Sequence, residues 1–162
     1  GDMRADWNLL VDERLDCGGD LRVGRDVEVG SACKIGGQTT VGGDVAVGAG
    51  LKCLSNIRVR GALKVGGSAW SAKGIEVNQR IDVREHLEAC WGIVSGKSIV
   101  AGGAIKAGES LAAEELIQAG EGYGIYAGLN VPVEVWEASA RVCARELPNR
   151  LFSGHWHEPT TS

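Results

Sequence analysis

Apolar residues recur at every sixth position from Leu9 to Val131, and this period is the strongest signal in the chain. A first apolar column begins at Leu9, and a second begins two residues later at Val11. Most members of the first column are aliphatic, as in Leu15, Leu21, Val27, Val45, Leu51, Ile57, Leu63, Ile75, Ile81, Leu87, Ile93, Ile99 and Ile105. The position after the second column is usually glycine, as in Gly24, Gly30, Gly36, Gly42, Gly48, Gly66, Gly96, Gly102 and Gly108.

A period of six with apolar residues two apart predicts short β-strands rather than helices. Residues i and i+2 of a strand point to the same side, whereas a helical face follows a period of about 3.6. Each hexad is therefore expected to form a strand with two inward side chains. The glycine that follows is expected to make a corner through a positive φ. Strands and corners repeated in this way give a coil of parallel β-structure.

The expected fold is an all-β, single-domain, triangular parallel β-solenoid (β-helix) with terminal caps. Three hexads make a turn of about 18 residues, so the repeat predicts about six to seven turns. We expect residues 1–8 to form an N-terminal tail or cap, residues 9–131 to form the solenoid, and residues 132–162 to form a C-terminal capping segment and tail. A β-sandwich or barrel of short strands is the alternative, although such folds do not keep one register through so many repeats.

Two known solenoid families resemble this pattern. The phrases Gly19-Asp20-Leu21 and Gly43-Asp44-Val45 resemble those of bactofilin-like polymer-forming proteins. The Val-Gly and Ala-Gly steps resemble the hexapeptide repeats of many acyltransferases, but those repeats have a small residue where this chain has Leu or Ile. The bactofilin-like resemblance is therefore the closer one. It implies a triangular coil over residues 9–131 and brings no catalytic residues with it.

The net charge bears on the class of partner, and the cysteines bear on the cellular location. A formal net charge of −4 argues against a nucleic-acid partner, and no apolar stretch is long enough to span a membrane. Cys17, Cys33 and Cys53 fall on inward positions of one face, where we expect reduced, buried thiols and hence a cytoplasmic location. His155 and His157 are too few for a metal site, so no metal or cofactor is expected.

The hexad consensus breaks between Leu54 and Gly92, which makes this region the candidate binding surface. Trp70 falls at an outward position, and Trp91 falls at the following corner one turn later. Exposed tryptophans are enriched at binding hot spots. The candidate protein-binding residues are Leu54, Trp70 and Trp91, with Arg60 and Arg84 as flanks.

An alternative interpretation of the same break is that one tryptophan bends inward. Ala69 and Ser71 are smaller than the usual inward residues, so a ring of Trp70 or Trp91 could fill the space beside them.

Of three function classes, the sequence favours a non-enzymatic module that binds a protein partner. An acyltransferase would use a histidine in a loop or cleft. The repeat reads without an inserted loop, however, with Tyr123 inward and no nucleophile near His86. A self-assembling scaffold needs a bare end, which the apolar tail after Val131 argues against. One specific version of the module is an immunity or antitoxin protein that neutralises a toxin, by analogy of size and charge. The oligomeric state is left open.

Overall fold

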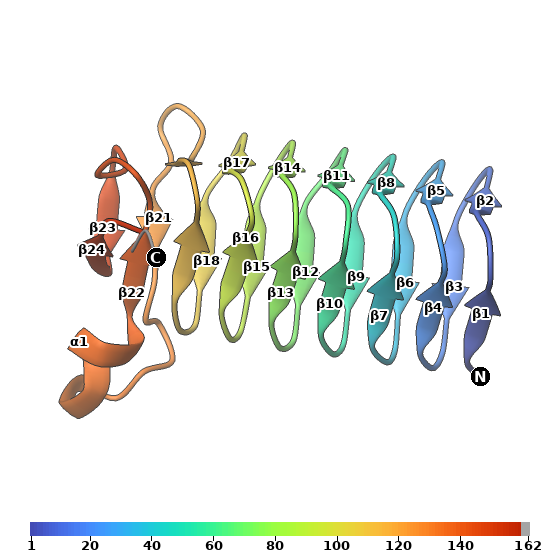
Figure 1. Ribbon diagram of the computed structural model, residues 1–162, viewed down its shortest axis with the longest axis horizontal. Coiled ribbons are helices and arrows are strands. Elements are labelled where there is room, and N and C mark those ends of the chain that lie inside the picture. The colour runs from blue at the N-terminus through green and yellow to red at the C-terminus, as the bar shows by residue number, and fades with distance from the viewer. Residues whose placement is uncertain (160–162) are drawn as a thin grey trace.

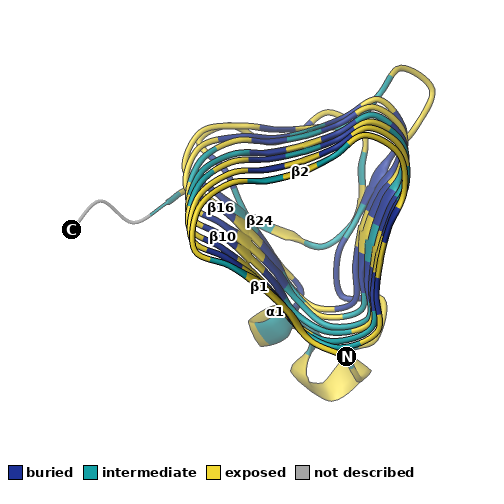
Figure 2. Cartoon of the chain, turned by 90° about the vertical axis from the view of Figure 1, so that its right-hand side faces the viewer, coloured by how far each residue is buried: buried dark blue, intermediate teal, exposed yellow. Residues whose placement is uncertain are grey.

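The protein is a parallel β-solenoid, seen in a computed structural model that describes residues 1–159. Successive turns stack along one axis, and the outline seen down that axis is triangular (Figures 1 and 2). The fold class expected from the hexads is therefore confirmed. The number of turns is about nine rather than six to seven, because strands are added at both ends of the repeat.

Three parallel sheets form the sides of the triangle, and each strand pairs with the strand one turn away. Sheet A consists of β1 (Met3–Ala5), β4 (Leu21–Val23), β7 (Thr39–Val41), β10 (Ile57–Val59), β13 (Ile75–Val77), β16 (Ile93–Ser95), β19 (Leu111–Ala113), β22 (Arg141–Cys143) and β24 (His155–His157). Sheet B consists of β2 (Leu9–Val11), β5 (Val27–Val29), β8 (Val45–Val47), β11 (Leu63–Val65), β14 (Ile81–Val83), β17 (Ile99–Ala101) and β20 (Ile117–Gln118). Sheet C consists of β3 (Leu15–Cys17), β6 (Cys33–Ile35), β9 (Leu51–Cys53), β12 (Ala69–Ser71), β15 (Leu87–Ala89), β18 (Ile105–Ala107), β21 (Ile125–Tyr126) and β23 (Leu151–Ser153).

The three corners are named here by the sheets that they join in chain order. The A/B corner follows each regular strand of sheet A, the B/C corner follows sheet B, and the C/A corner follows sheet C.

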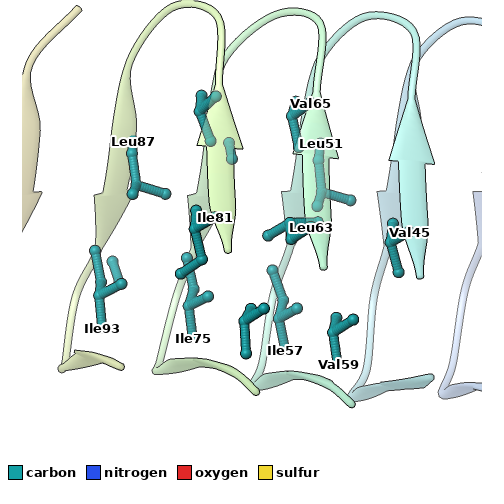
Figure 3. Close-up of a cluster of buried hydrophobic side chains, with 14 of the residues drawn as sticks. Val45, Leu51, Ile57, Val59, Leu63, Val65, Ile75, Ile81, Leu87 and Ile93 are labelled. Carbon is teal, nitrogen blue, oxygen red and sulfur yellow. The ribbon is translucent and has the colours of Figure 1, made fainter. Parts of the chain in front are cut away.

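The interior is a column of aliphatic side chains contributed by all three sheets. Ile57, Leu63, Ile75, Ile81 and Leu87 are each at most 2% exposed, and their side chains lie on the inner side of the strands (Figure 3). Burying one such side chain stabilises a fold by about 1.5–3 kcal/mol. Alternation of inward and outward residues along each strand is therefore what sets the register of the whole coil.

The corners are held by side chains that reach from one turn to the next. The Asp26 carboxylate accepts a hydrogen bond from the backbone N–H of Asp44, and Asp44 accepts one from Ala62, both at 2.8 Å. Asp20 does the same for Gln38, and Asn56 does so for Gly74. The Gly-Asp phrases of the sequence thus mark ladders of side chains that satisfy backbone donors, with Asp26 and Asp44 before strands of sheet B and Asp20 and Asn56 before strands of sheet A.

The corner glycines are required by close stacking and not by a positive φ, so that expectation was wrong. Among the described residues, the glycines with positive φ are Gly122, Gly128 and Gly154, all beyond the regular hexads. A Cβ at Gly42 would overlap the carbonyl oxygen of Gly24 one turn below, and a Cβ at Gly43 would overlap the Asp26 carboxylate. Glycine leaves room for the turn beneath it.

The two ends of the coil are unlike each other. At the N-terminal end β1 pairs in register with β4, so residues 1–8 already contain the first stacked strand. Met3 is 38% exposed there, and Leu9 and Val11 are only half-buried. At the other end Trp156 pairs with the fully buried Val142 and donates its indole N–H to the carbonyl of Ala144 at 3.0 Å. The core is thus open at the start and covered at the finish.

The repeat contains an insertion that the sequence analysis did not recognise. Leu87 pairs with Ile105, but Ile105 pairs with Ile125, an interval two residues longer. The extra residues form a loop around Gly122 that projects from the B/C corner (Figure 2). Tyr123, expected inward, is 45% exposed, and Ile125 takes the inward position instead. The expectation of a coil without an inserted loop was therefore wrong.

The segment after Pro132 leaves the coil and then returns to it. A 3-10 turn η1 (Val133–Val135) and a short helix α1 (Trp136–Ser139) lie outside the triangle at the C/A corner (Figures 1 and 2). The chain then adds β22 and β24 to sheet A and β23 to sheet C. The helical residues of the described chain thus lie after Pro132, as the hexads predicted.

Candidate functional site

Leu54 and Trp91 lie on the C/A corner, and both are exposed as expected. Their side chains are 43% and 46% exposed. Leu54 follows β9 and Trp91 follows β15, so the corner residues of one intervening turn separate them. Lys73, from that intervening turn, places its ammonium 5.5 Å from the centre of the Trp91 ring. The corner thus presents apolar side chains with a cation between them.

Trp70 lies on the flat face of sheet C, beside that corner. It stands at the outward position of β12, between Lys52 of β9 and Glu88 of β15. Its ring is half-buried, and the Lys52 ammonium lies 5.4 Å from the ring centre. Neither Trp70 nor Trp91 belongs to the buried core, so the alternative of an inward tryptophan does not hold.

The small inward residue Ser71 forms hydrogen bonds with the backbone, and no tryptophan ring packs inward beside it. Ser71 is fully buried, and its hydroxyl donates to the carbonyl of Ser55 at 2.7 Å and accepts the N–H of Lys73 at 3.1 Å. Cys53, one turn earlier at the same position, directs its thiol toward the carbonyl of Gly37 at 3.1 Å. These inward polar atoms satisfy carbonyl groups at the C/A corner.

The structure does not bring Arg60 and Arg84 to this corner. Arg60 follows β10 and lies on the A/B corner, and Arg84 follows β14 and lies on the B/C corner. Sheet A therefore separates Arg60 from Leu54 and Trp91, and sheet C separates Arg84 from them. Both arginines are exposed, but they do not flank the candidate surface.

Sequence reasoning missed a second group of exposed aromatic residues on the face of sheet C. Tyr126 and Phe152 stand on β21 and β23, with ring centres 5.7 Å apart. Together with Trp70, Glu88, Lys106 and the loop residue Tyr123, they line an open groove of about 510 Å³. The signal that could have revealed Tyr126 is the Ile-x-Ala-Gly consensus itself, which recurs as Ile125-Tyr126-Ala127-Gly128, eight residues after Ile117-Gln118-Ala119-Gly120 instead of six.

His86 lies at the edge of this groove, where it acts as a member of the corner ladder. Its Nδ1 accepts the backbone N–H of Ala104 at 3.0 Å, as Asp44 accepts that of Ala62. The Tyr123 ring packs edge-on against the imidazole, with ring centres 5.2 Å apart. Because Nδ1 accepts a hydrogen bond, the neutral ring carries its proton on Nε2.

The three cysteines expected in one core face are found there. Cys17, Cys33 and Cys53 are buried, unpaired and located on β3, β6 and β9 of sheet C. Burial is the main cause that raises the pKa of the Cys33 thiol to about 12, with smaller contributions from the neighbouring Cys53, Cys17 and Asp16. A thiol with so high a pKa is a poor nucleophile near neutral pH, which suits a packing role.

Residues 1–159 contain neither a candidate metal-ion site nor a helix that could span a membrane. No group of three or more His, Cys, Asp or Glu side chains in this part of the chain is placed to hold a metal ion. None of the helices in the described range has the length and hydropathy that a membrane crossing requires. His155 and His157 stack on each other with ring centres 5.4 Å apart.

Comparison with models of known protein families, with curated proteins and with solved structures found no match. The resemblance to bactofilin-like proteins thus rests on the sequence phrases alone.

Proposed function

We propose that this protein is a non-enzymatic interaction module that binds a protein partner through its C/A corner. The observation that carries the proposal is the exposure of Leu54 and Trp91 on a rigid corner. At the position of Leu54, three other turns of this corner have glycine, namely Gly18, Gly36 and Gly108. Large apolar side chains on a rigid surface, surrounded by polar groups, are typical of binding hot spots. Trp70 extends this surface onto the face of sheet C.

The charges around these residues indicate the chemistry of the partner. The chain as a whole carries a formal charge of −4, yet the cations beside Trp91 and Trp70 are Lys73 and Lys52. A partner that places carboxylates beside an apolar contact would pair with both lysines. We therefore infer an acidic rim around an apolar centre on the partner.

The proposal is tested by finding the partner and then removing single rings. A pull-down from the native host followed by mass spectrometry gives candidates, and calorimetric titration measures their affinity. Truncating a hot-spot tryptophan costs at least about 2 kcal/mol, so Trp91→Ala should weaken binding roughly thirtyfold. Its melting temperature should stay near that of the wild type, because the ring lies outside the core.

Trp7 provides a matched control. It is also exposed, at 65%, and also carries a cation over its ring, with Arg25 at 4.5 Å, but it lies on the A/B corner. Trp7→Ala should leave affinity unchanged. If Trp91→Ala and Trp70→Ala both melt as the wild type and bind the identified partner with wild-type affinity, the C/A corner is not the interface.

A toxin is the specific partner that we propose to test first, on the basis of the small size and acidic charge of the chain. Co-expression with a toxin encoded beside it should protect cells, and Trp91→Ala should reduce that protection. A chain that binds such a toxin but gives no protection would keep the interaction and remove the immunity role.

A self-assembling scaffold is a second candidate, favoured by the bare N-terminal end. Met3, Leu9 and Val11 are incompletely covered there, and the outer edges of β1 and β2 present unpaired backbone groups. Electron microscopy of the intact protein at physiological salt separates the two functions. Ordered filaments would favour the scaffold, and dispersed particles would favour the module.

A further inference from the structure

The outward residues of sheet C form a straight row along the long axis. Lys52, Trp70, Glu88, Lys106 and Tyr126 are register partners on successive strands. Phe152 of β23 ends the row, with its ring 5.7 Å from that of Tyr126. Strands are spaced about 4.8 Å apart, so the part of the row from Lys52 to Phe152 is about 24 Å long. Lys34 and Asp16 continue the row toward the N-terminal end.

This row carries more exposed aromatic surface than the other outward rows of the coil. Phe152 is 65% exposed, and Trp70 and Tyr126 are half-buried beside the open groove. The centre of the row holds a carboxylate and an ammonium side by side, Glu88 and Lys106. Aromatic groups on either side of opposite charges on a flat, rigid face are a suitable surface for a protein partner.

When a second copy of this row is turned end to end, each residue from Lys52 to Phe152 faces a residue of complementary type. We propose that this face binds a second copy of the chain, with a twofold axis that lies parallel to the strands between β15 and β18. Glu88 then faces Lys106 of the second copy, and Trp70 faces Tyr126 of that copy. Lys52 faces the ring of Phe152 of the second copy, as a cation over an aromatic ring. Twofold symmetry makes each of these contacts twice.

Charge selects this register over its neighbours. Moving the axis by half a strand spacing toward the N-terminal end places Glu88 against its own copy. Moving it equally far toward the other end places Lys106 against its own copy. Like charges brought together across an interface are unfavourable, whereas the proposed register pairs every charge of the row from Lys52 to Phe152 with an opposite charge or a ring.

The row favours a second copy over an unrelated acidic or basic partner, because it offers both signs in an order that this chain itself complements. The inference does not rest on the proposed function. Leu54 and Trp91 stand on the C/A corner, beside the row, and Trp70 is the residue that the two surfaces share. Trp91→Ala therefore tests partner binding and should leave self-association unchanged.

Charge reversal and its repair test the proposal. Analytical ultracentrifugation of the full chain over a range of concentrations should show a monomer–dimer equilibrium. Glu88→Lys places lysine against Lys106 at two symmetric contacts, so the dimer dissociation constant should rise by at least about tenfold. Lys106→Glu should do the same. The double variant Glu88→Lys/Lys106→Glu restores opposite charges at both contacts and should restore the dimer.

Glu28→Lys is the control, because Glu28 is an exposed outward residue of β5 on sheet B. It changes the net charge by the same amount as Glu88→Lys and should leave the equilibrium unchanged. Circular dichroism spectra and melting temperatures of all variants should match the wild type, since Glu28, Glu88 and Lys106 are all exposed. A wild-type protein that remains a monomer at every concentration would overturn the proposal. So would a dimer that resists both single reversals, or a double variant that stays monomeric.

Discussion

Ser71 allows a quantitative test of how the C/A corner is stabilised. Its side chain is fully buried at the second inward position of β12, where most other strands have Val, Ile, Cys or Ala and β16 has Ser95. The hydroxyl bonds to two backbone groups: it donates to the carbonyl of Ser55, and the N–H of Lys73 donates to it. Ser71→Val introduces the residue that Val59, Val65 and Val77 provide at this position of other strands, and it removes both hydrogen bonds.

The expected destabilisation follows from the groups that lose a partner. A buried donor or acceptor left without a hydrogen bond costs about 1–3 kcal/mol. For a chain of this length, 1 kcal/mol shifts the melting temperature by about 2–4 °C. Ser71→Val should therefore melt about 2–12 °C below the wild type, and its midpoint in urea should fall without a change in the slope m.

Ser71→Cys is the matched control that the repeat itself provides. Cys53 occupies the same position one turn earlier, and its thiol bonds to the carbonyls of Gly37 and Asn56 at 3.1 and 3.7 Å. A cysteine at position 71 can make the same contacts, so Ser71→Cys should cost less than about 1 kcal/mol. If Ser71→Val is as stable as the wild type, or if both variants are equally destabilised, the hydrogen bonds of Ser71 do not stabilise the fold.

Three further predictions follow from the core, the corner ladder and the C-terminal end. Native Cys17, Cys33 and Cys53 should react slowly with thiol reagents and rapidly after denaturation; fast native labelling of all three would contradict their burial. The pKa of the Cys33 thiol is raised from 9.0 to about 12 in the folded state, so the folded state favours the neutral thiol. The contribution of this thiol to the free energy of unfolding is therefore complete below pH 9 and should be lost between pH 9 and 12, which urea titrations at increasing pH can measure. Asp44→Ala should lower the free energy of unfolding by about 0.5–1.5 kcal/mol, because it removes the hydrogen bond from the N–H of Ala62. Asp82→Ala removes only an exposed ion pair with Arg80 and should cost less. Equal melting temperatures of the two variants would argue against the ladder. Deleting residues after Val131 removes Trp156 from the end of the core and should cause aggregation, measured by light scattering; a soluble truncated chain that melts as the wild type would contradict a capping role for the tail.

The regular part of the coil could be predicted because its cause is local. Each strand places two aliphatic residues inward, and each corner leaves room for the turn below, so one hexad contains the rule for the next. The first turn was missed because its hexad offers only Met3 and Ala5 as inward residues, a weak apolar signal. Pairing with β4 makes that weak strand part of the sheet.

The insertion was missed for a reason that lies in the period of a strand. Both apolar columns point inward, so a shift of two residues moves one column onto the other and leaves the alternation unchanged. Tyr123 and Ile125 are both hydrophobic, and either could occupy the inward position. The pairing of Ile125 with Ile105 settles which of the two is inward, and that contact connects different turns.

Some residues of the candidate site are placed by the local hexad period, and others by pairing between distant parts of the chain. Leu54, Trp70 and Trp91 could be placed outside the core from the hexad frame alone, and the structure confirms their exposure or half-exposure. The aromatic row could not be assembled in this way, because Tyr126 depends on the insertion. Phe152 depends on a strand that joins sheet C after a detour through α1.

Because the two ends of the coil differ, self-association through the ends alone should give closed pairs and not filaments. A filament that grows head to tail needs two complementary ends, and here the core is covered by Trp156 at one of them. Contact between two open N-terminal ends, around Met3 and Leu9, would give a closed pair and then stop. A twofold contact through sheet C is closed in the same way. Only the two contacts acting together would propagate, since each copy would then join one neighbour by its end and another by its face. Filament formation by the wild type, and its loss in Glu88→Lys, would therefore identify both surfaces at once.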